Sequence, residues 1–180
     1  MNDLQLLLHT RLRLPVGQVL SLAADGDGLV AGTAPEGLVY RVGPKGDTSL
    51  VARTGESYVW GLAPAGRGAW WAATGTRGRL LRVEKGSVRV VFDSEESHLV
   101  SLIADRRGGV FAGGDSRGRV YRVDDTGRAR TVFDAAEDEI RALALGADGA
   151  LYAAALSGSA VAIERDPGAA QVLVRRRAIG

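Results

Sequence analysis

His98 is the residue of this sequence whose type and neighbours come closest to a catalytic arrangement. It follows Glu95 and Glu96, and a histidine beside a carboxylate is a common general base in proton-transfer reactions. A lyase or hydrolase would need His98 within hydrogen-bond reach of a carboxylate inside a pocket. The other histidine, His9, lies far away near the start of the chain, and carboxylates beside a histidine are common by chance. We therefore expect a protein that is not an enzyme.

Other chemistries lack the residues that they require. The chain has no cysteine, which excludes disulfides, thiolate metal sites and a cysteine nucleophile. Its one asparagine, Asn2, leaves no set of amide and carboxylate ligands for a metal, and the segment from Asp25 to Gly28 lacks the glutamate that completes a calcium loop. No phosphate-binding loop, dinucleotide fingerprint or serine nucleophile elbow occurs. The sequence predicts no metal and no cofactor.

Charge and hydropathy favour neither nucleic acid nor a membrane as a partner. Lys and Arg number 23 against 21 Asp and Glu, a formal net charge of +2. The one basic run, Arg175 to Arg177, is expected to be a solvated tail, because phosphate binding usually needs a broader basic face. No apolar run approaches the roughly 18 residues that span a bilayer. Asp3 and the short apolar stretch after it do not fit a signal peptide, which slightly favours the cytoplasm.

An internal repeat is the strongest pattern in the chain. Two landmarks recur, a leucine near the start of each unit and a glycine in its middle. The leucines are Leu22, Leu62, Leu102 and Leu143, spaced 40, 40 and 41 residues apart, and the glycines are Gly37, Gly78, Gly118 and Gly158, spaced 41, 40 and 40. Two landmarks that keep the same period indicate four structural repeats of about 40 residues.

Each unit predicts four short strands, A to D, separated by glycine-rich turns. Apolar runs are four to six residues long and glycine interrupts them often, which favours strands over helices. Strand A is expected at 19–23, 59–63, 99–104 and 140–145, and strand B at 29–33, 69–74, 109–113 and 150–155. Strand C is expected at 38–42, 79–83, 119–123 and 159–163, and strand D at 49–53, 88–92, 130–133 and 171–175.

The predicted fold is all-β: a β-propeller, or a segment of one, with four blades of four antiparallel strands. Strands A and B show little polar alternation and should be covered on both faces, whereas C and D alternate more and should lie further out. A radial stack of four-stranded sheets has this distribution, with a typical repeat of 40–45 residues. We expect one domain over 1–180, with blades at 19–56, 57–96, 97–137 and 138–180 after an extra outer strand and lead-in at 4–18.

The chain resembles bacterial propeller repeats of the broad WD-repeat and NHL-like kind. The matching residues are G-x-V-Y-R-V on strand C (Gly37 to Val42 and Gly118 to Val123), Leu-x-Ala-Gly on strand B, and V-F-D at the end of strand D. The Gly-His and Trp-Asp pairs of true WD repeats are absent. The resemblance covers nearly the whole chain and implies an architecture and a tendency towards binding roles.

The closure of the ring has two alternatives. If Leu4 to His9 form an additional D strand, it can pair with the last blade and close a four-blade ring, which would bury a sheet edge. Otherwise the four blades form part of a larger ring, completed by a second copy or by further sequence. Uncovered blade faces would then need a partner, because repeat arrays need capped ends.

Two positions of the repeat distinguish packing from possible function. Trp71 aligns with Phe111, Tyr152 and Val30, and a large apolar residue in that place predicts packing between blades. Trp60 aligns with Leu20, Val100 and Arg141. Trp60 and Arg141 are therefore candidates to line a central channel or its mouth. The alternative is that Trp60 fills core while Arg141 pairs with a carboxylate.

The D-to-A loops and B-to-C turns should share one face of the propeller, here called the D–A face. This face is mainly acidic with arginines interspersed, so a basic partner or a cationic ligand would suit it. The candidate binding residues are Tyr58, Trp60, Arg77, Glu95, Glu96, His98, Arg117 and Arg141. The preferred function is a non-catalytic scaffold for protein–protein interaction or self-assembly through blade edges, with a protein partner or a homo-oligomer. The alternative is a ligand-sensing module that uses the D–A face.

Overall fold

Each repeat of the sequence forms one four-stranded antiparallel sheet. The computed structural model describes residues 14, 16–157, 160–166 and 177–178. Blade 1 comprises β1 (Gln18–Asp25), β2 (Gly28–Ala34), β3 (Leu38–Val42) and β4 (Thr48–Arg53). Blade 2 comprises β5 (Tyr58–Pro64), β6 (Trp70–Gly75), β7 (Arg79–Glu84) and β8 (Ser87–Asp93). Blade 3 comprises β9 (Leu99–Ala104), β10 (Val110–Gly114), β11 (Arg119–Val123) and β12 (Ala129–Asp134). Blade 4 comprises β13 (Glu139–Leu145), β14 (Leu151–Ser157), β15 (Ala160–Asp166) and β16 (Arg177–Ala178).

The expected strands agree with these bounds to within a few residues, except in the fourth strand of blade 4. The described strand there is β16, where Arg177 pairs with Val161 of β15, although the sequence predicted a solvated tail for this arginine. Residues 171–175, predicted for that strand, and the extra strand predicted at Leu4 to His9 lie outside the described residues. Within the described ranges no helix is present, and none that could span a membrane.

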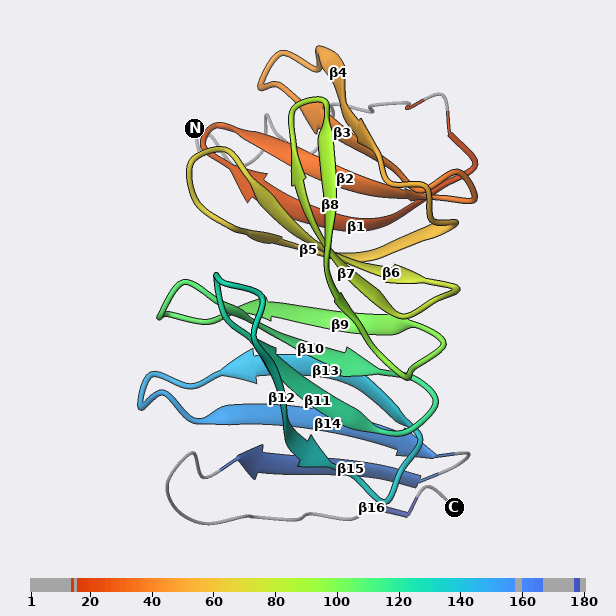
Figure 1. Cartoon of the computed structure of the whole chain (residues 1–180), viewed down its shortest axis with the longest axis vertical. Helices are drawn as coiled ribbons and strands as arrows, with labels where there is room; N and C mark the ends of the chain where they lie inside the picture. Colours follow the sequence, from red (N-terminus) through yellow and green to blue (C-terminus); the bar gives the residue numbers. More distant parts are fainter. Residues whose placement is uncertain (1–13, 15, 158–159, 167–176, 179–180) are drawn as a thin grey trace, which may run out of the picture.

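The blades stack in chain order to form a row (Figure 1). The first strands of successive blades pack on one another, β1 on β5, β5 on β9 and β9 on β13. Blades 1 and 4 lie at opposite ends of the row (Figure 1). Leu22 on β1 is exposed. Among the described residues the blades therefore form an open part of a propeller, and not the self-closed ring that was one of our two alternatives.

Three apolar clusters hold the row together, one at each junction between blades. The cluster between blades 2 and 3 contains Trp71, whose side chain is fully buried. Val30 occupies the same register between blades 1 and 2, and Phe111 packs against the cluster between blades 3 and 4. The predicted role of this register in packing between blades is confirmed at these three positions.

The landmark glycines are required by the backbone. Gly37, Gly78 and Gly118 have φ angles of +55°, +51° and +62°, a region that side chains with a Cβ rarely adopt. A Cβ at each position would also overlap the main-chain carbonyl of a D-to-A loop residue, Glu56, Glu96 or Glu137. The glycine repeat therefore marks the point where the B-to-C turn and the following D-to-A loop are in direct contact.

β-bulges recur in the inner strand of every blade. The register between the first two strands shifts at Leu20, Trp60, Val100 and Arg141. A bulge inserts one extra residue and redirects its side chain. Trp60 and Arg141, the two candidates for the channel mouth, and their aligned equivalents Leu20 and Val100 are therefore the bulged residues of their blades.

Candidate functional site

Three rings, called here the aromatic triad, meet on the D–A face between blades 2 and 3: Tyr58, Trp60 and His98. The rings of Tyr58 and Trp60 are stacked, with centroids 5.3 Å apart and an interplanar angle of 19°. The His98 ring stands edge-on to both, with each centroid distance at 5.7 Å. All three side chains are partly exposed. The structure thus brings together three of the predicted site residues.

The position of His98 is fixed by its backbone and by a close approach of glycine. Its N–H donates to the carboxylate of Asp115 at 2.8 Å, and the Asp115 N–H donates to the His98 carbonyl at 3.2 Å. His98 also bridges to Gly75, where a Cβ would overlap the imidazole. Gly75 is therefore needed to admit the ring.

The hydrogen bond of the His98 ring is to an indole. Trp60 Nε1–H donates to His98 Nδ1 at 3.0 Å, so the neutral imidazole carries its proton on Nε2. The partners of Glu95 and Glu96 lie on blade 3. The arrangement required by the hydrolase or lyase hypothesis, a carboxylate paired with His98 inside a pocket, is not the geometry of the described residues.

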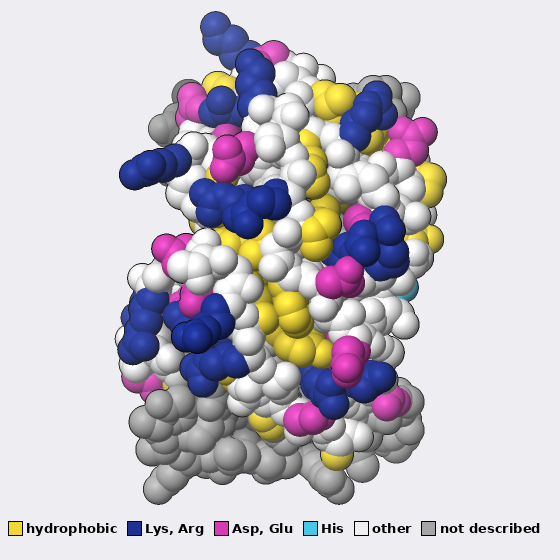
Figure 2. Space-filling view, viewed as in Figure 1, with side chains coloured by type: hydrophobic (Ala, Val, Ile, Leu, Met, Phe, Trp, Pro, Cys, Tyr) yellow, Lys and Arg dark blue, Asp and Glu magenta, His cyan; other side chains and the backbone are white. Residues whose placement is uncertain are grey.

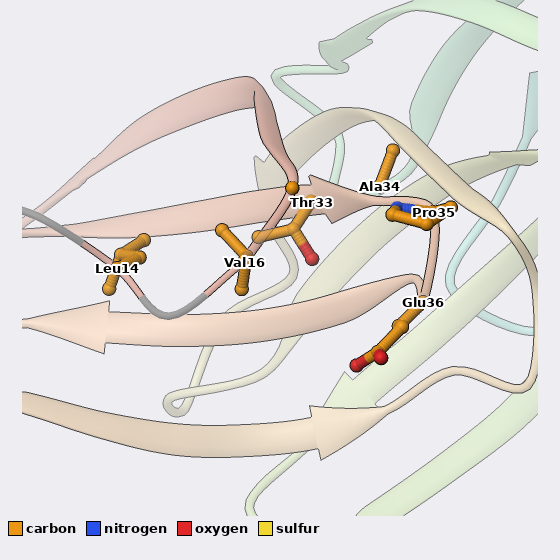
Figure 3. A pocket seen from close by; sticks show the side chains of 7 residues that line it. Leu14, Val16, Thr33, Ala34, Pro35 and Glu36 are labelled. Carbon is orange, nitrogen blue, oxygen red and sulfur yellow. The ribbon is translucent and has the colours of Figure 1, made fainter.

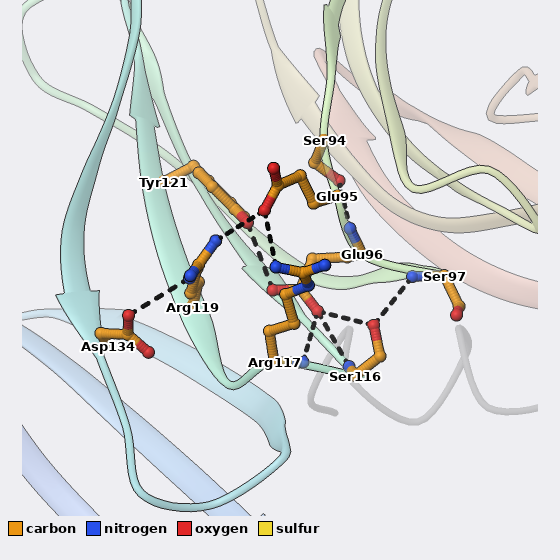
Figure 4. Close-up of polar contacts among 9 residues, drawn as sticks. All are labelled: Ser94, Glu95, Glu96, Ser97, Ser116, Arg117, Arg119, Tyr121 and Asp134. Atoms are coloured by element: carbon orange, nitrogen blue, oxygen red, sulfur yellow. Dashed lines mark hydrogen bonds and ion pairs between the residues drawn. The ribbon is translucent and has the colours of Figure 1, made fainter.

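Glu96 is buried at the same junction, where it joins blade 2 to blade 3. Its carboxylate accepts hydrogen bonds from the N–H groups of Ser116 and Arg117, both at 2.8 Å, and from the Ser116 hydroxyl at 3.0 Å (Figure 4). The Tyr121 hydroxyl donates to its other oxygen at 3.3 Å. Burial and the nearby charge of Glu96 raise the pKa of Tyr121. We assign Glu96 a structural role, although the sequence had suggested a contact with a partner.

A buried glutamate in each D-to-A loop is a feature that our sequence analysis missed. Glu56, Glu96 and Glu137 are spaced 40 and 41 residues apart and are only 7%, 4% and 8% exposed. The Glu56 carboxylate accepts from Arg77 at 2.8 and 3.3 Å and from Arg79 at 3.4 Å. The recurrence of glutamate in the loops was visible in the sequence and could have identified it.

The remaining predicted residues form ion pairs, either with each other or with carboxylates that the sequence analysis did not single out. Arg117 and Arg119 both contact Glu95, at 2.8 and 2.9 Å, and Arg119 also binds Asp134 (Figure 4). Arg141 is exposed and pairs with Glu139 at 2.8 Å, as the structural alternative for this residue proposed. Since β9 lies between β5 and β13, Arg141 is not part of the aromatic triad.

Within the described part of the chain, two pockets near the D–A face have linings that do not include the triad. One of about 350 Å³ borders blade 1 and is lined by Leu14, Val16, Gly17, Thr33, Ala34, Pro35 and Glu36 (Figure 3). Val16 lies 40 residues before Glu56, so it occupies the position that holds a buried glutamate in the later loops. Pro35 lines the same pocket and has no N–H that could donate to a carboxylate at that position. The other, of about 290 Å³, lies between β8 and β11–β12 and is lined partly by Phe92 and Tyr121.

The outer surface carries both apolar and charged side chains. Hydrophobic side chains form a strip over the middle of the face that β8 and β12 present, and Lys and Arg flank it (Figure 2). No group of three His, Asp or Glu within the described segments has the arrangement of a metal site.

The comparisons with known proteins show the fold. No protein-family model and no curated protein sequence matches the chain. The propeller of a nidogen/laminin complex is 16% identical, with a TM-score of 0.75 over 92% of this chain and 65% of that one. A streptogramin B lyase is 12% identical, with a TM-score of 0.74 over 93% of this chain and 57% of that one. A gluconolactonase-like protein is 13% identical, with a TM-score of 0.71 over 94% of this chain and 66% of that one. The chain spans about three fifths of these neighbours and is similar in architecture to β-propellers that include both binding proteins and enzymes.

Proposed function

We propose that this chain is a non-catalytic propeller scaffold for protein–protein interaction or self-assembly, and that the outward face of blade 1 is its binding surface. The observation that carries the proposal is the exposure of interblade residues on this face. Val19 on β1 is 45% exposed, whereas its equivalents Val59, Leu99 and Ile140 are fully buried. Leu22 is 62% exposed, against 9% for Leu62. Blade 1 therefore carries the side chains of an interblade face that no described blade covers.

The apolar character of this face favours a partner. Full burial of a valine or leucine side chain contributes about 1.5–3 kcal/mol. Leu29 on β2 is also exposed, at 40%, whereas its equivalent in blade 2, Trp70, is buried. Exposed apolar residues in an otherwise buried register are typical of interaction surfaces.

The surface that would fit blade 1 is the outward face of another blade, because such a face covers the equivalent residues elsewhere in the row. The chain offers one at blade 4, the last sheet of the described part of the row. Ala142 and Ala144 are exposed there on β13. A contact between blade 1 of one copy and blade 4 of another would be heterologous, forming a ring if the rotation closes and a filament if it does not.

The polar contacts of the D–A face support a role without catalysis. Arg77, Arg117 and Arg119 are held by Glu56 and Glu95, and Glu96 is held by backbone amides. These carboxylates are thus used to join blades or to neutralise arginines.

Sedimentation velocity on matched valine variants tests the proposal. We expect species heavier than the 18.9 kDa monomer at micromolar concentration, and a shift to monomer in Val19→Asp, which places a charge in the interface. Val90→Asp is the control, because Val90 is 47% exposed but lies on the edge strand of blade 2. A wild-type chain that stays monomeric, or equal effects of the two variants, would contradict self-assembly.

A ligand-sensing module is the second candidate function. The observation that favours it is the aromatic triad, which places three partly exposed rings together on the predicted face.

A further inference from the structure

We propose that the aromatic triad binds an organic cation, either a quaternary ammonium group or a guanidinium group. This inference deepens the ligand-binding candidate and does not depend on assembly through blade 1. It names a chemistry that two sources share, a free small molecule and an arginine side chain of a partner.

Tyr58 and Trp60 are the ring types that cations recognise, and stacking on each other leaves one face of each ring unused by the pair. A cation over the face of a tryptophan or tyrosine ring is attracted by the negative charge density of that face. Tyr58 and Trp60 are stacked and partly exposed, whereas the other tryptophans, Trp70 and Trp71, are buried. Trp60 is the bulged residue of β5, so its ring is displaced from the regular alternation of the strand.

The charges around the triad favour a cation over an anion. The Nδ1 lone pair of His98 accepts the hydrogen bond from the Trp60 indole. The carboxylate of Asp115 lies beside it, on the His98 N–H. Arg77 and Arg117, on the flanking turns, are paired with Glu56 and Glu95, so their charges are largely compensated.

The same positions at the next junction do not form such a site. In the register of Tyr58, Trp60 and His98, the junction between blades 3 and 4 has His98, Val100 and Glu139. The aromatic rings are therefore not required by the repeat itself. They are a local addition, because the position of Trp60 holds leucine, valine or arginine in the other blades.

Fluorescence titration of the chain with choline tests the site, because Trp60 is the partly exposed tryptophan. The control ligand is 3,3-dimethyl-1-butanol, which has the shape of choline without its charge. We expect saturable binding of choline and at least tenfold weaker binding of the alcohol. Equal binding of the two, or no binding of choline, would overturn the proposal.

The variant Trp60→Leu tests the contribution of the indole ring to binding. Leucine is chosen because Leu20 occupies the same bulge in blade 1. It should weaken choline binding about tenfold with an unchanged circular dichroism spectrum. Isothermal titration calorimetry replaces fluorescence for this variant, which lacks the reporter. Val100→Leu, at the bulge of blade 3, is the matched control and should leave the affinity unchanged. Loss of binding in the control, or full binding in Trp60→Leu, would contradict the assignment.

The source of the cation is distinguished by comparing choline with the peptide Gly-Arg-Gly and its citrulline analogue. Tighter binding of the arginine peptide than of choline and of the citrulline peptide indicates a protein partner. Tighter binding of choline indicates a small ammonium ligand. Binding of the citrulline peptide as tight as that of both cations would overturn cation recognition. Val19→Asp keeps the triad, so its choline affinity separates this result from a failure of assembly.

Discussion

Blades 1 and 2 carry the same kind of surface in two different surroundings. Val59 and Leu62 of blade 2 pack in the apolar cluster against blade 1, while Val19 and Leu22 occupy the same register of blade 1 and are exposed. The side chains are identical in type at both positions. The difference is that a described blade packs against this side of blade 2 and no described blade packs against blade 1, which teaches that each repeat carries the same interface residues in covered and uncovered surroundings.

The largest expected effect is on the free energy of unfolding, when an aspartate replaces Val59 of blade 2 or its equivalent Val19 of blade 1. Val59→Asp would bury an unpaired charge between blades 1 and 2 and should cost about 3–5 kcal/mol, or prevent folding. Val19→Asp should change stability by less than about 1 kcal/mol, because the side chain stays hydrated in the monomer. Urea unfolding, with Val19→Asp measured where it is monomeric, checks the difference. Similar losses in both variants would mean that blade 1 is covered within the chain.

A smaller effect should distinguish the buried glutamates of successive junctions. Glu96→Ala removes the acceptor of four hydrogen bonds, one of them from the buried Tyr121 hydroxyl, and should cost about 2–3 kcal/mol. Glu56→Ala frees Arg77, which is exposed and can be hydrated, so about 1 kcal/mol is expected. Thermal unfolding of the two variants provides the measurement. The assignment of Glu96 as the stronger link fails if Glu56→Ala is the more destabilising.

Glycine substitutions should sharpen the same comparison at the turns. Gly78→Ala introduces a Cβ at a φ of +51° and against the Glu96 carbonyl, so it should cost about 2 kcal/mol. Gly86→Ala, at +72° with open space around the Cβ, should cost about 1 kcal/mol. Denaturant midpoints report both. Equal costs would show that backbone conformation alone, and not the contact with the loop, requires the landmark glycine.

The smallest expected effect is on the pH dependence of the melting temperature under alkaline conditions. Since burial and Glu96 raise the pKa of Tyr121 above the usual 10.0, the unfolded phenol ionises first. The stability that this group contributes is complete below pH 10.0 and falls as the pH rises through the folded pKa. Tyr121→Phe should therefore show a shallower decline in melting temperature between about pH 9 and 11. An unchanged slope would argue against a buried phenol beside Glu96.

The repeat made most of the fold predictable. Regular spacing of Leu22 and its equivalents, together with glycine turns, was enough to locate the strands, and alignment of Trp71 with Val30 and Phe111 identified the packing between blades. The open row could not be decided from the sequence, because the same residues suit a closed ring and a segment.

The candidate site was predictable only in part. Sequence alignment brought Trp60 to the channel register and His98 to the same face, but the indole-to-imidazole hydrogen bond depends on the bulge in β5, which shifts one side chain by local geometry. The sequence alone also could not show that Glu95 and Glu96 have different roles. They are adjacent in sequence, yet one is exposed and the other is buried under the B-to-C turn.

The most direct test of the central claim is the accessibility of Leu22 in the purified chain. Because the sequence has no cysteine, Leu22→Cys introduces a single thiol on the outward face of blade 1, and Val90→Cys introduces one on the edge of blade 2. We predict that the thiol at position 22 reacts with a maleimide progressively more slowly as protein concentration rises, while the rate at position 90 stays constant. Equal rates at both positions at all concentrations would contradict a binding surface on blade 1.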